Sequence, residues 1–153
     1  GPWGRPDMAP MIFADAIYSK KVINVFNEGE MQRDFTYIDD VVNAIISLCK
    51  RPAEINETLE NDYLEPSSSF APYRIFNIAN GSRVDLMYFI KLLEKSIGKK
   101  AKLNFEKMQP GDLKSTWADT SELSKWINFK PKVKIEEGVT LFSEWFLNYK
   151  EGK

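Results

Sequence analysis

The spacing of apolar residues along the chain predicts an alternation of helices and strands. Apolar residues recur every three or four positions, as on the buried face of a helix, in 38–50, 86–97 and 135–150. Shorter helices are expected over 10–19 and 121–127. Apolar or alternating runs favour strands at 22–26, 31–35, 73–79 and 101–108. No repeat accompanies the alternation, so we expect one mixed α/β domain over residues 1–153.

Several residues mark the ends of the predicted helices. Pro10 suits a first helical turn, and Gly98 suits the end of the helix over 86–97. Asp119 or Thr120 can cap the helix over 121–127. The spacing of a capping box precedes two other helices, in Thr36 with Asp39 and in Ser82 with Asp85.

The polar segments predict how these elements connect. The NEGE stretch at 27–30 separates two apolar strands and favours a hairpin of 22–26 with 31–35. Residues 51–72 carry Pro and Ser without a clear period, and we expect a flexible surface loop there.

Composition excludes several classes of chemistry. The formal net charge of −1 gives no reason to expect nucleic acid or an anionic membrane surface as a partner. No apolar run approaches the roughly 20 residues of a membrane span, and no signal-peptide pattern opens the chain. The single cysteine, Cys49, allows no internal disulfide, which favours a cytoplasmic location. The chain contains no histidine, so Ser–His, Cys–His and His-ligated metal mechanisms are excluded within it.

Two short stretches carry candidate chemistry. Arg33 and Asp34 form either a solvated ion pair on a hairpin or, in Arg33, a fork for phosphate oxygens with Phe35 packed against its stem. The QPGD stretch at 109–112 predicts a type II turn, whose Asp112 can face a ligand hydroxyl or a phosphate. Residue types alone favour the ion pair and the turn.

Two other stretches resemble dinucleotide-enzyme motifs only in part. The opening GPWGRPD has glycines and the cation Arg5, but no strand precedes it, so the dinucleotide fingerprint fails. Tyr149 and Lys153 have the Tyr-x-x-x-Lys spacing of short-chain dehydrogenase catalysis. Because Tyr149 continues the apolar face of a helix, we interpret that match as chance, and we expect no catalytic, cofactor-binding or metal-binding residue in this chain.

Taken in order, five stretches resemble one family: GPWGRPDMA, FNEGEMQRDFTYIDDVVNAI, FNIANG, MQPGDLKSTWADTSEL and FKPKVKIEEGVTLFSEWF. They are similar to the carboxyl-terminal part of the extended short-chain dehydrogenase/reductase nucleotide-sugar epimerases, most of all to the UDP-glucuronate 4-epimerases. The resemblance implies the UDP-sugar-binding part of a Rossmann-type enzyme whose amino-terminal core is absent. That core would bind NAD and carry catalysis. The resemblance thereby implies an isomerase of polysaccharide biosynthesis. This chain alone is expected to be inactive.

The resemblance also implies roles for individual residues. Arg33 matches the family arginine on the diphosphate, and Asp112 matches the acidic residue on a ribose hydroxyl. Asn24, Val25 and Phe26 match the strand whose backbone and aromatic ring meet the uracil.

Further matches lie in the opening loop and before Asp112. Asp7 and Met8 match the loop beside the nucleotide, where many relatives have asparagine in place of Asp7. Arg5 matches an arginine near the substrate of the glucuronate type. Gln109 stands where the glucose type has an arginine to the phosphate, so this chain offers one cation fewer.

Two alternatives stay open. In the first, the chain is part of a related enzyme of the same fold: a UDP-glucose 4-epimerase, or a nucleotide-sugar dehydratase, decarboxylase or reductase. In the second, it is a non-catalytic interaction module on that scaffold. The expected partners are a UDP-sugar, the missing Rossmann domain and possible further copies of the chain.

Overall fold

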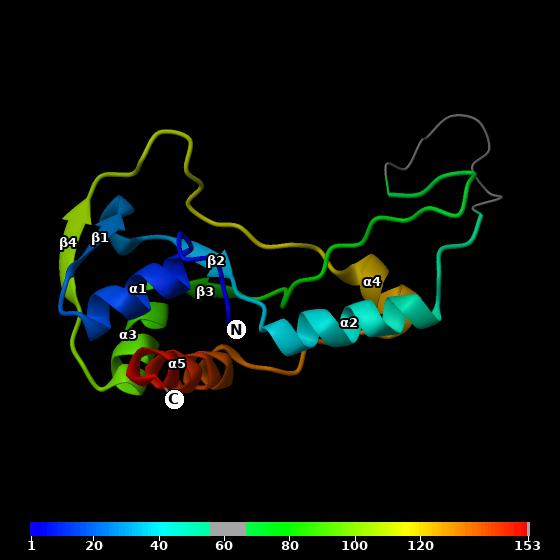
Figure 1. Ribbon diagram of the computed structural model, residues 1–153. Helices are drawn as coiled ribbons and strands as arrows, with labels where there is room; N and C mark the ends of the chain where they lie inside the picture. The colour runs from blue at the N-terminus through cyan, green and yellow to red at the C-terminus, as the bar shows by residue number, and fades with distance from the viewer. Residues whose placement is uncertain (56–66, 153) are drawn as a thin grey trace.

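The computed structural model describes residues 1–55 and 67–152 (Figure 1). Its elements follow in this order: α1 (Ala9–Tyr18), β1 (Val22–Phe26), a 3-10 turn (Asn27–Gly29), β2 (Gln32–Asp34), α2 (Ile38–Lys50), β3 (Arg83–Asp85), α3 (Leu86–Ile97), β4 (Lys102–Glu106), α4 (Ser121–Ile127) and α5 (Ile135–Glu151). The five predicted helices are present. Within the described residues, no helix has the length and apolarity needed to cross a membrane.

The strands pair in two separate ribbons, and the predicted hairpin is wrong. β1 runs parallel to β4, from Val22 beside Lys102 to Phe26 beside Glu106. β2 runs antiparallel to β3. The turn after β1 places Asn27, Glu28 and Gly29 at φ of 51°, 51° and 81°. Three left-handed residues in succession redirect the chain away from β1 instead of folding it back, so β2 finds another partner.

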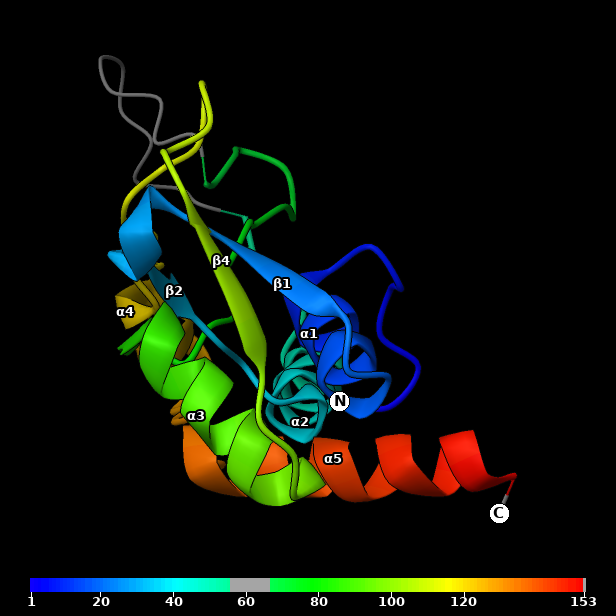
Figure 2. The same ribbon diagram turned by 90° about the vertical axis from the view of Figure 1, so that its left-hand side faces the viewer.

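The hydrophobic core lies between β1 and helices α1, α3 and α5. Figure 2 shows α3 and α5 packed together beside the β1–β4 ribbon. The most buried side chains of this core include Ile17, Ile23, Val25, Ile90, Leu93 and Phe146. Each large apolar side chain removed from water contributes roughly 1.5–3 kcal/mol, so this cluster is the main source of stability.

Helix α2 lies apart from this core and next to α4 (Figure 1). Only Asp40 and Ala44 of α2 are buried. The apolar side chains Ile38, Val42, Ile45 and Ile46 remain 42–48% exposed. The spacing of apolar residues predicted the helix correctly. However, the described residues leave exposed the apolar face that this spacing produces.

The strand predicted at 73–79 is not formed. One isolated bridge joins Ser68 to Arg74, and no further ladder extends along this segment among the described residues. Tyr73, Ile75 and Asn77 are exposed, whereas the residues between them are half-buried. The segment therefore keeps the two-residue alternation of a strand without a partner strand beside it. The chain forms β3 a few residues later instead.

The prediction of two capping boxes is also wrong, because side chains assigned to them bind other segments. Thr36 Oγ1 accepts the Asn80 N–H at 3.1 Å, and Asp85 accepts Gln32 Nε2–H at 2.8 Å. The predictions that held are Asp119, which accepts the Ser121 N–H at 2.8 Å, and Gly98, which ends α3 at φ 74°. Of the predicted loop at 51–72, residues 56–66 lie outside the described residues, and its flexibility stays a prediction.

Asp40 ties the outlying helix α2 to the rest of the molecule. It is only 3% exposed, and its carboxylate accepts the N–H groups of Lys132 and Val133 at 3.0–3.1 Å. We expect Asp40→Ala to lower the free energy of unfolding by about 1–3 kcal/mol, because two partly buried N–H groups lose their charged acceptor. Asp39→Ala, on the exposed neighbour, is the control and should stay within about 0.5 kcal/mol. Equal losses in denaturant titrations would contradict this role of Asp40.

Candidate functional site

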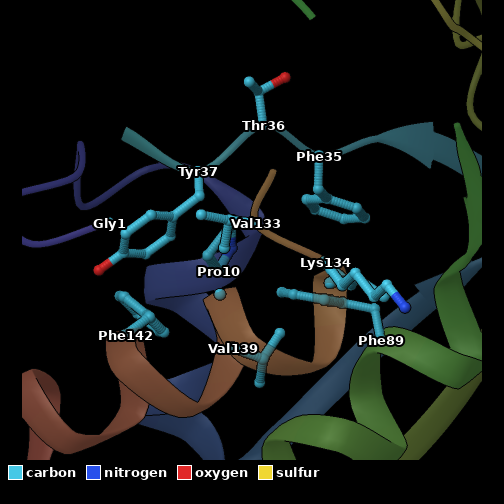
Figure 3. A pocket seen from close by; sticks show the side chains of 12 residues that line it. Gly1, Pro10, Phe35, Thr36, Tyr37, Phe89, Val133, Lys134, Val139 and Phe142 are labelled. Atoms are coloured by element: carbon cyan, nitrogen blue, oxygen red, sulfur yellow. The ribbon is translucent and has the colours of Figure 1, made fainter. Parts of the chain in front are cut away.

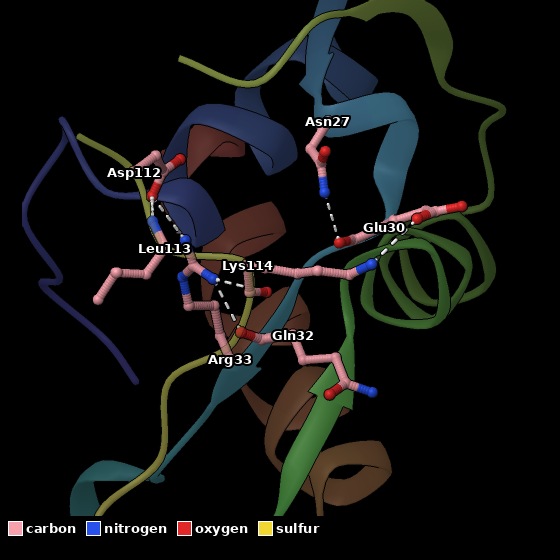
Figure 4. A network of polar contacts seen from close by, with 7 residues as sticks. All are labelled: Asn27, Glu30, Gln32, Arg33, Asp112, Leu113 and Lys114. Carbon is pink, nitrogen blue, oxygen red and sulfur yellow. Dashed lines mark hydrogen bonds and ion pairs between the residues drawn. The ribbon is translucent and has the colours of Figure 1, made fainter. Parts of the chain in front are cut away.

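The candidate site is built around Arg33 on β2 (Figure 4). Arg33 Nη2 donates to Asp112 Oδ1 at 2.9 Å. Its Nη1 donates to the carbonyl of Gln32 at 2.8 Å and to that of Lys114 at 3.5 Å. The side chains of Arg33 and Asp112 are 30% and 33% exposed. The guanidinium is thus held in place while a third of its surface faces solvent.

The interpretation of Arg33 and Asp34 as a local ion pair is wrong. Asp34 Oδ2 accepts the Gly81 N–H at 2.9 Å, on the turn before β3. Its other oxygen is buried and has no hydrogen-bond partner among the residues that the structure describes. Asp34 therefore fixes the β2–β3 ribbon, and the cation beside it pairs with a residue from a distant segment.

The segment after β4 brings Asp112 to Arg33. Asp112 N–H donates to the Gln109 carbonyl at 3.2 Å, and Gly111 has a φ of 84°, so the predicted turn is present. Further along, Gln32 N–H donates to the Lys114 carbonyl at 2.9 Å and Thr116 N–H to the Gln32 carbonyl at 3.3 Å. These bonds dock the segment along the edge of β2.

Sequence reasoning missed the part that Lys114 plays in the site. Its carbonyl accepts from both Arg33 and Gln32, whereas its ammonium pairs with Glu30 at 3.2 Å, away from Arg33 (Figure 4). Every residue has a carbonyl, so no residue type could have marked this acceptor.

The three predicted residues of β1 differ in what they can offer a ligand. Val25 is fully buried in the core, backbone included, so neither its side chain nor its backbone is open to a ligand here. Asn24 is exposed and accepts from Asn104 Nδ2 at 3.3 Å. Phe26 is half-buried at the end of the strand, from which the chain continues toward β2. Their roles toward uracil stay predictions.

The predicted residues of the opening loop form a second group. Arg5 makes a bidentate pair with Asp7 through Nε at 3.1 Å and Nη2 at 2.5 Å, and both side chains are exposed. Met8 is 52% exposed, and its carbonyl accepts the first N–H groups of α1. Among the described residues, no hydrogen bond or ion pair joins this group to Arg33 or Asp112. The structure thus brings together Arg33, Asp112 and the backbone of Gln109, but not Arg5.

A separate cavity lies between Tyr37, α3 and α5 (Figure 3). It is lined mainly by apolar groups, among them Phe35, Phe89, Val139 and Phe142, and its volume is about 90 Å³. Sites for small ligands usually measure some 300–1,000 Å³. No predicted site residue lines this cavity, which is too small for a nucleotide sugar.

The fold and the forked arginine agree with the carboxyl-terminal part of an extended short-chain dehydrogenase/reductase. The family model described as GDP-mannose 4,6 dehydratase matches residues 7–142, and the chain belongs to that family. The Staphylococcus aureus protein CapI is 46% identical over 149 residues, which cover 97% of this chain and 45% of that protein. A probable UDP-glucuronate 4-epimerase of Rhizobium meliloti (strain 1021) is 44% identical over 147 residues, 95% of this chain and 43% of that protein.

Solved structures give the same result. A crystal structure of the UDP-glucuronic acid 4-epimerase from Bacillus cereus with UDP-glucuronic acid and NAD superposes with a TM-score of 0.75 at 29% identity. The match covers 97% of this chain and 42% of that one. The chain thus spans less than half the length of the relatives it matches, and the resemblance seen in the sequence is confirmed.

A double-mutant cycle can measure the Arg33–Asp112 pair in the ligand-free chain. Because both side chains are partly solvated, we expect Arg33→Ala and Asp112→Ala to couple by about 0.2–1 kcal/mol in the free energy of unfolding. Arg5 and Asp7, at 74% and 61% exposure, form the control pair and should couple less. A coupling energy well above that range would show a pair too strong to open for a ligand.

Proposed function

We propose that this chain is the UDP-sugar-binding part of an NAD-dependent nucleotide-sugar 4-epimerase that acts on UDP-glucuronate. The observation that carries the proposal is the Arg33 fork, which is oriented by two carbonyls and Asp112 at a partly open surface. Relatives of 44–46% identity, one of them named a probable UDP-glucuronate 4-epimerase, support the substrate.

In this proposal Arg33 exchanges its partner when substrate binds. A planar guanidinium suits the oxygens of a diphosphate, which it can meet with two parallel hydrogen bonds. Asp112 is thereby released and lies beside the phosphate site, within reach of a ribose hydroxyl. Binding through the nucleotide leaves the sugar free to turn over, as 4-epimerisation requires.

The described residues do not fit NAD. A dinucleotide site needs a glycine-rich turn between a strand and the start of a helix. Among the described residues, no glycine-rich turn joins the end of a strand to the start of a helix. NAD and the catalytic groups therefore belong, in this proposal, to an amino-terminal domain outside the chain, and no step of the reaction is placed on residues 1–153.

A nucleotide-sugar dehydratase is the second candidate. The matching family model is itself described as a dehydratase, which favours it. A dTDP-glucose 4,6-dehydratase structure has a TM-score of 0.76 at 14% identity, which shows only that the fold is shared. The two candidates differ in product: an epimerase retains the oxygen at C6, and a 4,6-dehydratase eliminates it as water.

The function is tested with the polypeptide that includes the segment preceding Gly1. We expect it to interconvert UDP-glucuronate and its C4 epimer when NAD is bound, and we expect residues 1–153 alone to show neither turnover nor NAD binding. Chromatography of the nucleotide sugars distinguishes epimer from dehydration product. UDP-glucose is offered in parallel, because its C6 hydroxyl can leave as water whereas the C6 carboxylate of UDP-glucuronate cannot. A 4-keto-6-deoxy product from UDP-glucose, or turnover by residues 1–153 alone, would overturn the proposal.

Arg33→Ala tests the diphosphate contact directly. In the longer polypeptide we expect it to weaken UDP binding in calorimetry by about 1.5–3 kcal/mol, because a charge-assisted hydrogen bond is lost. Arg33→Lys should recover only part, since a point charge cannot reproduce the fork. Arg74→Ala is the matched control: Arg74 is also half-buried and paired, with Glu122 at 3.5 Å, but lies near α4. Equal UDP affinity in all these proteins would remove Arg33 from the site.

The bare face of α2 supports the missing amino-terminal domain as a partner. We expect residues 1–153 alone to bind dyes that report exposed apolar surface and to self-associate at high concentration. Replacing both Ile45 and Ile46 by Glu should reduce dye binding and association. Ile12→Glu is the control, because Ile12 on α1 is 46% exposed, close to the 48% of Ile45. Monomeric behaviour without dye binding would argue against the missing partner.

A further inference from the structure

Three aromatic rings join the opening loop to the last helix. Trp145 and Tyr149, one turn apart on α5, stack with their ring centroids 5.5 Å apart and their planes at 16°. The ring of Trp3 meets both edge-on, at 5.4 Å from Trp145 and 5.6 Å from Tyr149. Edge-to-face contacts of this kind are attractive beyond the area they bury.

Trp3 needs these contacts to hold its position. It has a φ of 59°, in a left-handed region that disfavours any residue with a side chain. The residue as a whole is 77% exposed, so burial contributes little. Within residues 1–55 and 67–152, residues 1–4 make no hydrogen bond to the remainder, although Gly1 packs closely on Ile38. The rings of α5 are therefore the main attachment of Trp3.

The position of Trp3 determines where Arg5 can reach. Arg5 follows two residues later, and its carbonyl accepts the Met8 N–H at 3.2 Å just before α1 begins at Ala9. The loop is thus fixed at one end by α1 and at the other by Trp3. The Arg5 side chain is exposed and bonds only to the neighbouring Asp7. Nothing else among the described residues restrains its direction.

We propose that Trp3, Trp145 and Tyr149 form an aromatic clasp that positions Arg5 toward the anionic substrate. The inference rests on the proposed function, because it takes Arg5 to meet the nucleotide sugar. Trp3, Trp145 and Tyr149 are positioning residues that touch no substrate. Helix α5, which otherwise builds the core, thereby supports the substrate loop.

The clasp predicts a loss of binding that differs from a loss of stability. Trp3→Gly removes the ring and at the same time suits the left-handed backbone, so the fold should survive. In the longer polypeptide we expect it to speed hydrogen exchange at the Met8 amide, which donates to the Arg5 carbonyl, and to raise KM for UDP-glucuronate about two- to ten-fold, with kcat nearly unchanged. Trp3→Phe, which keeps a ring, should restore most of the affinity.

Two further comparisons tie the effect to α5 and to Arg5. Tyr149→Ala should reproduce Trp3→Gly in part, whereas Leu141→Ala, at another exposed apolar position of α5, should leave KM and exchange unchanged. Arg5→Ala should raise KM by itself, and adding Trp3→Gly to it should raise KM no further, because both changes remove the same contact.

The outcomes separate the clasp from the proposed function. Unchanged exchange at the Met8 amide of Trp3→Gly overturns the clasp, as does faster exchange with unchanged KM. If Arg5→Ala still raises KM in either case, the proposed function stands. If Arg5→Ala leaves KM unchanged, Arg5 does not meet the substrate, and the clasp falls with it. Additive effects of Arg5→Ala and Trp3→Gly on KM would also overturn the clasp.

Discussion

The parallel pairing of β1 with β4 determines where the candidate site forms. In a parallel ribbon both strands run in the same direction, so the segments that follow them leave from the same end. Residues 27–34 follow β1 and residues 107–116 follow β4, and both leave the ribbon beside each other. Gln32 then bonds to the backbone of Lys114 and Thr116. The meeting of Arg33 with Asp112, 79 positions later, is a consequence of this geometry.

In the proposed function, the magnitudes favour a contact of Arg33 with a diphosphate over its ion pair with Asp112. A partly solvated pair such as Arg33–Asp112 contributes roughly 0.2–1 kcal/mol. A hydrogen bond from a guanidinium to a charged phosphate contributes about 1.5–3 kcal/mol, and a diphosphate offers more than one oxygen. Asp112 can therefore orient the Arg33 guanidinium in the ligand-free chain and still be displaced from it by a diphosphate. The two carbonyl contacts already restrict the rotamers of Arg33 before a ligand binds. Less conformational entropy is therefore lost on binding.

The sequence predicted the features that depend on neighbouring residues. It failed for the features that contacts between distant segments determine. Helix periods and the Gly98 stop are local signals, and the helices were correct. The hairpin failed because left-handed residues at Asn27 and Glu28 cannot be inferred from NEGE. Thr36 and Asp85 were assigned to caps, but Asn80 and Gln32 bind them instead. Arg33 and Asp112 were predicted as site residues through family resemblance, and that role stays a prediction, whereas no local pattern predicted that they would pair.

The distribution of apolar surface divides the molecule into a closed part and an open part. The core of α1, α3, α5 and β1 buries its own apolar face, and it supports Arg33 through β2 and the opening loop through Trp145. Helix α2 and the segment 73–79 present apolar side chains outward and depend on Asp40 and a few polar contacts for attachment. A chain that functioned alone would expose such a face at a cost in solubility. In the proposed function, the closed part holds the nucleotide, and the open part is the interface with the amino-terminal domain.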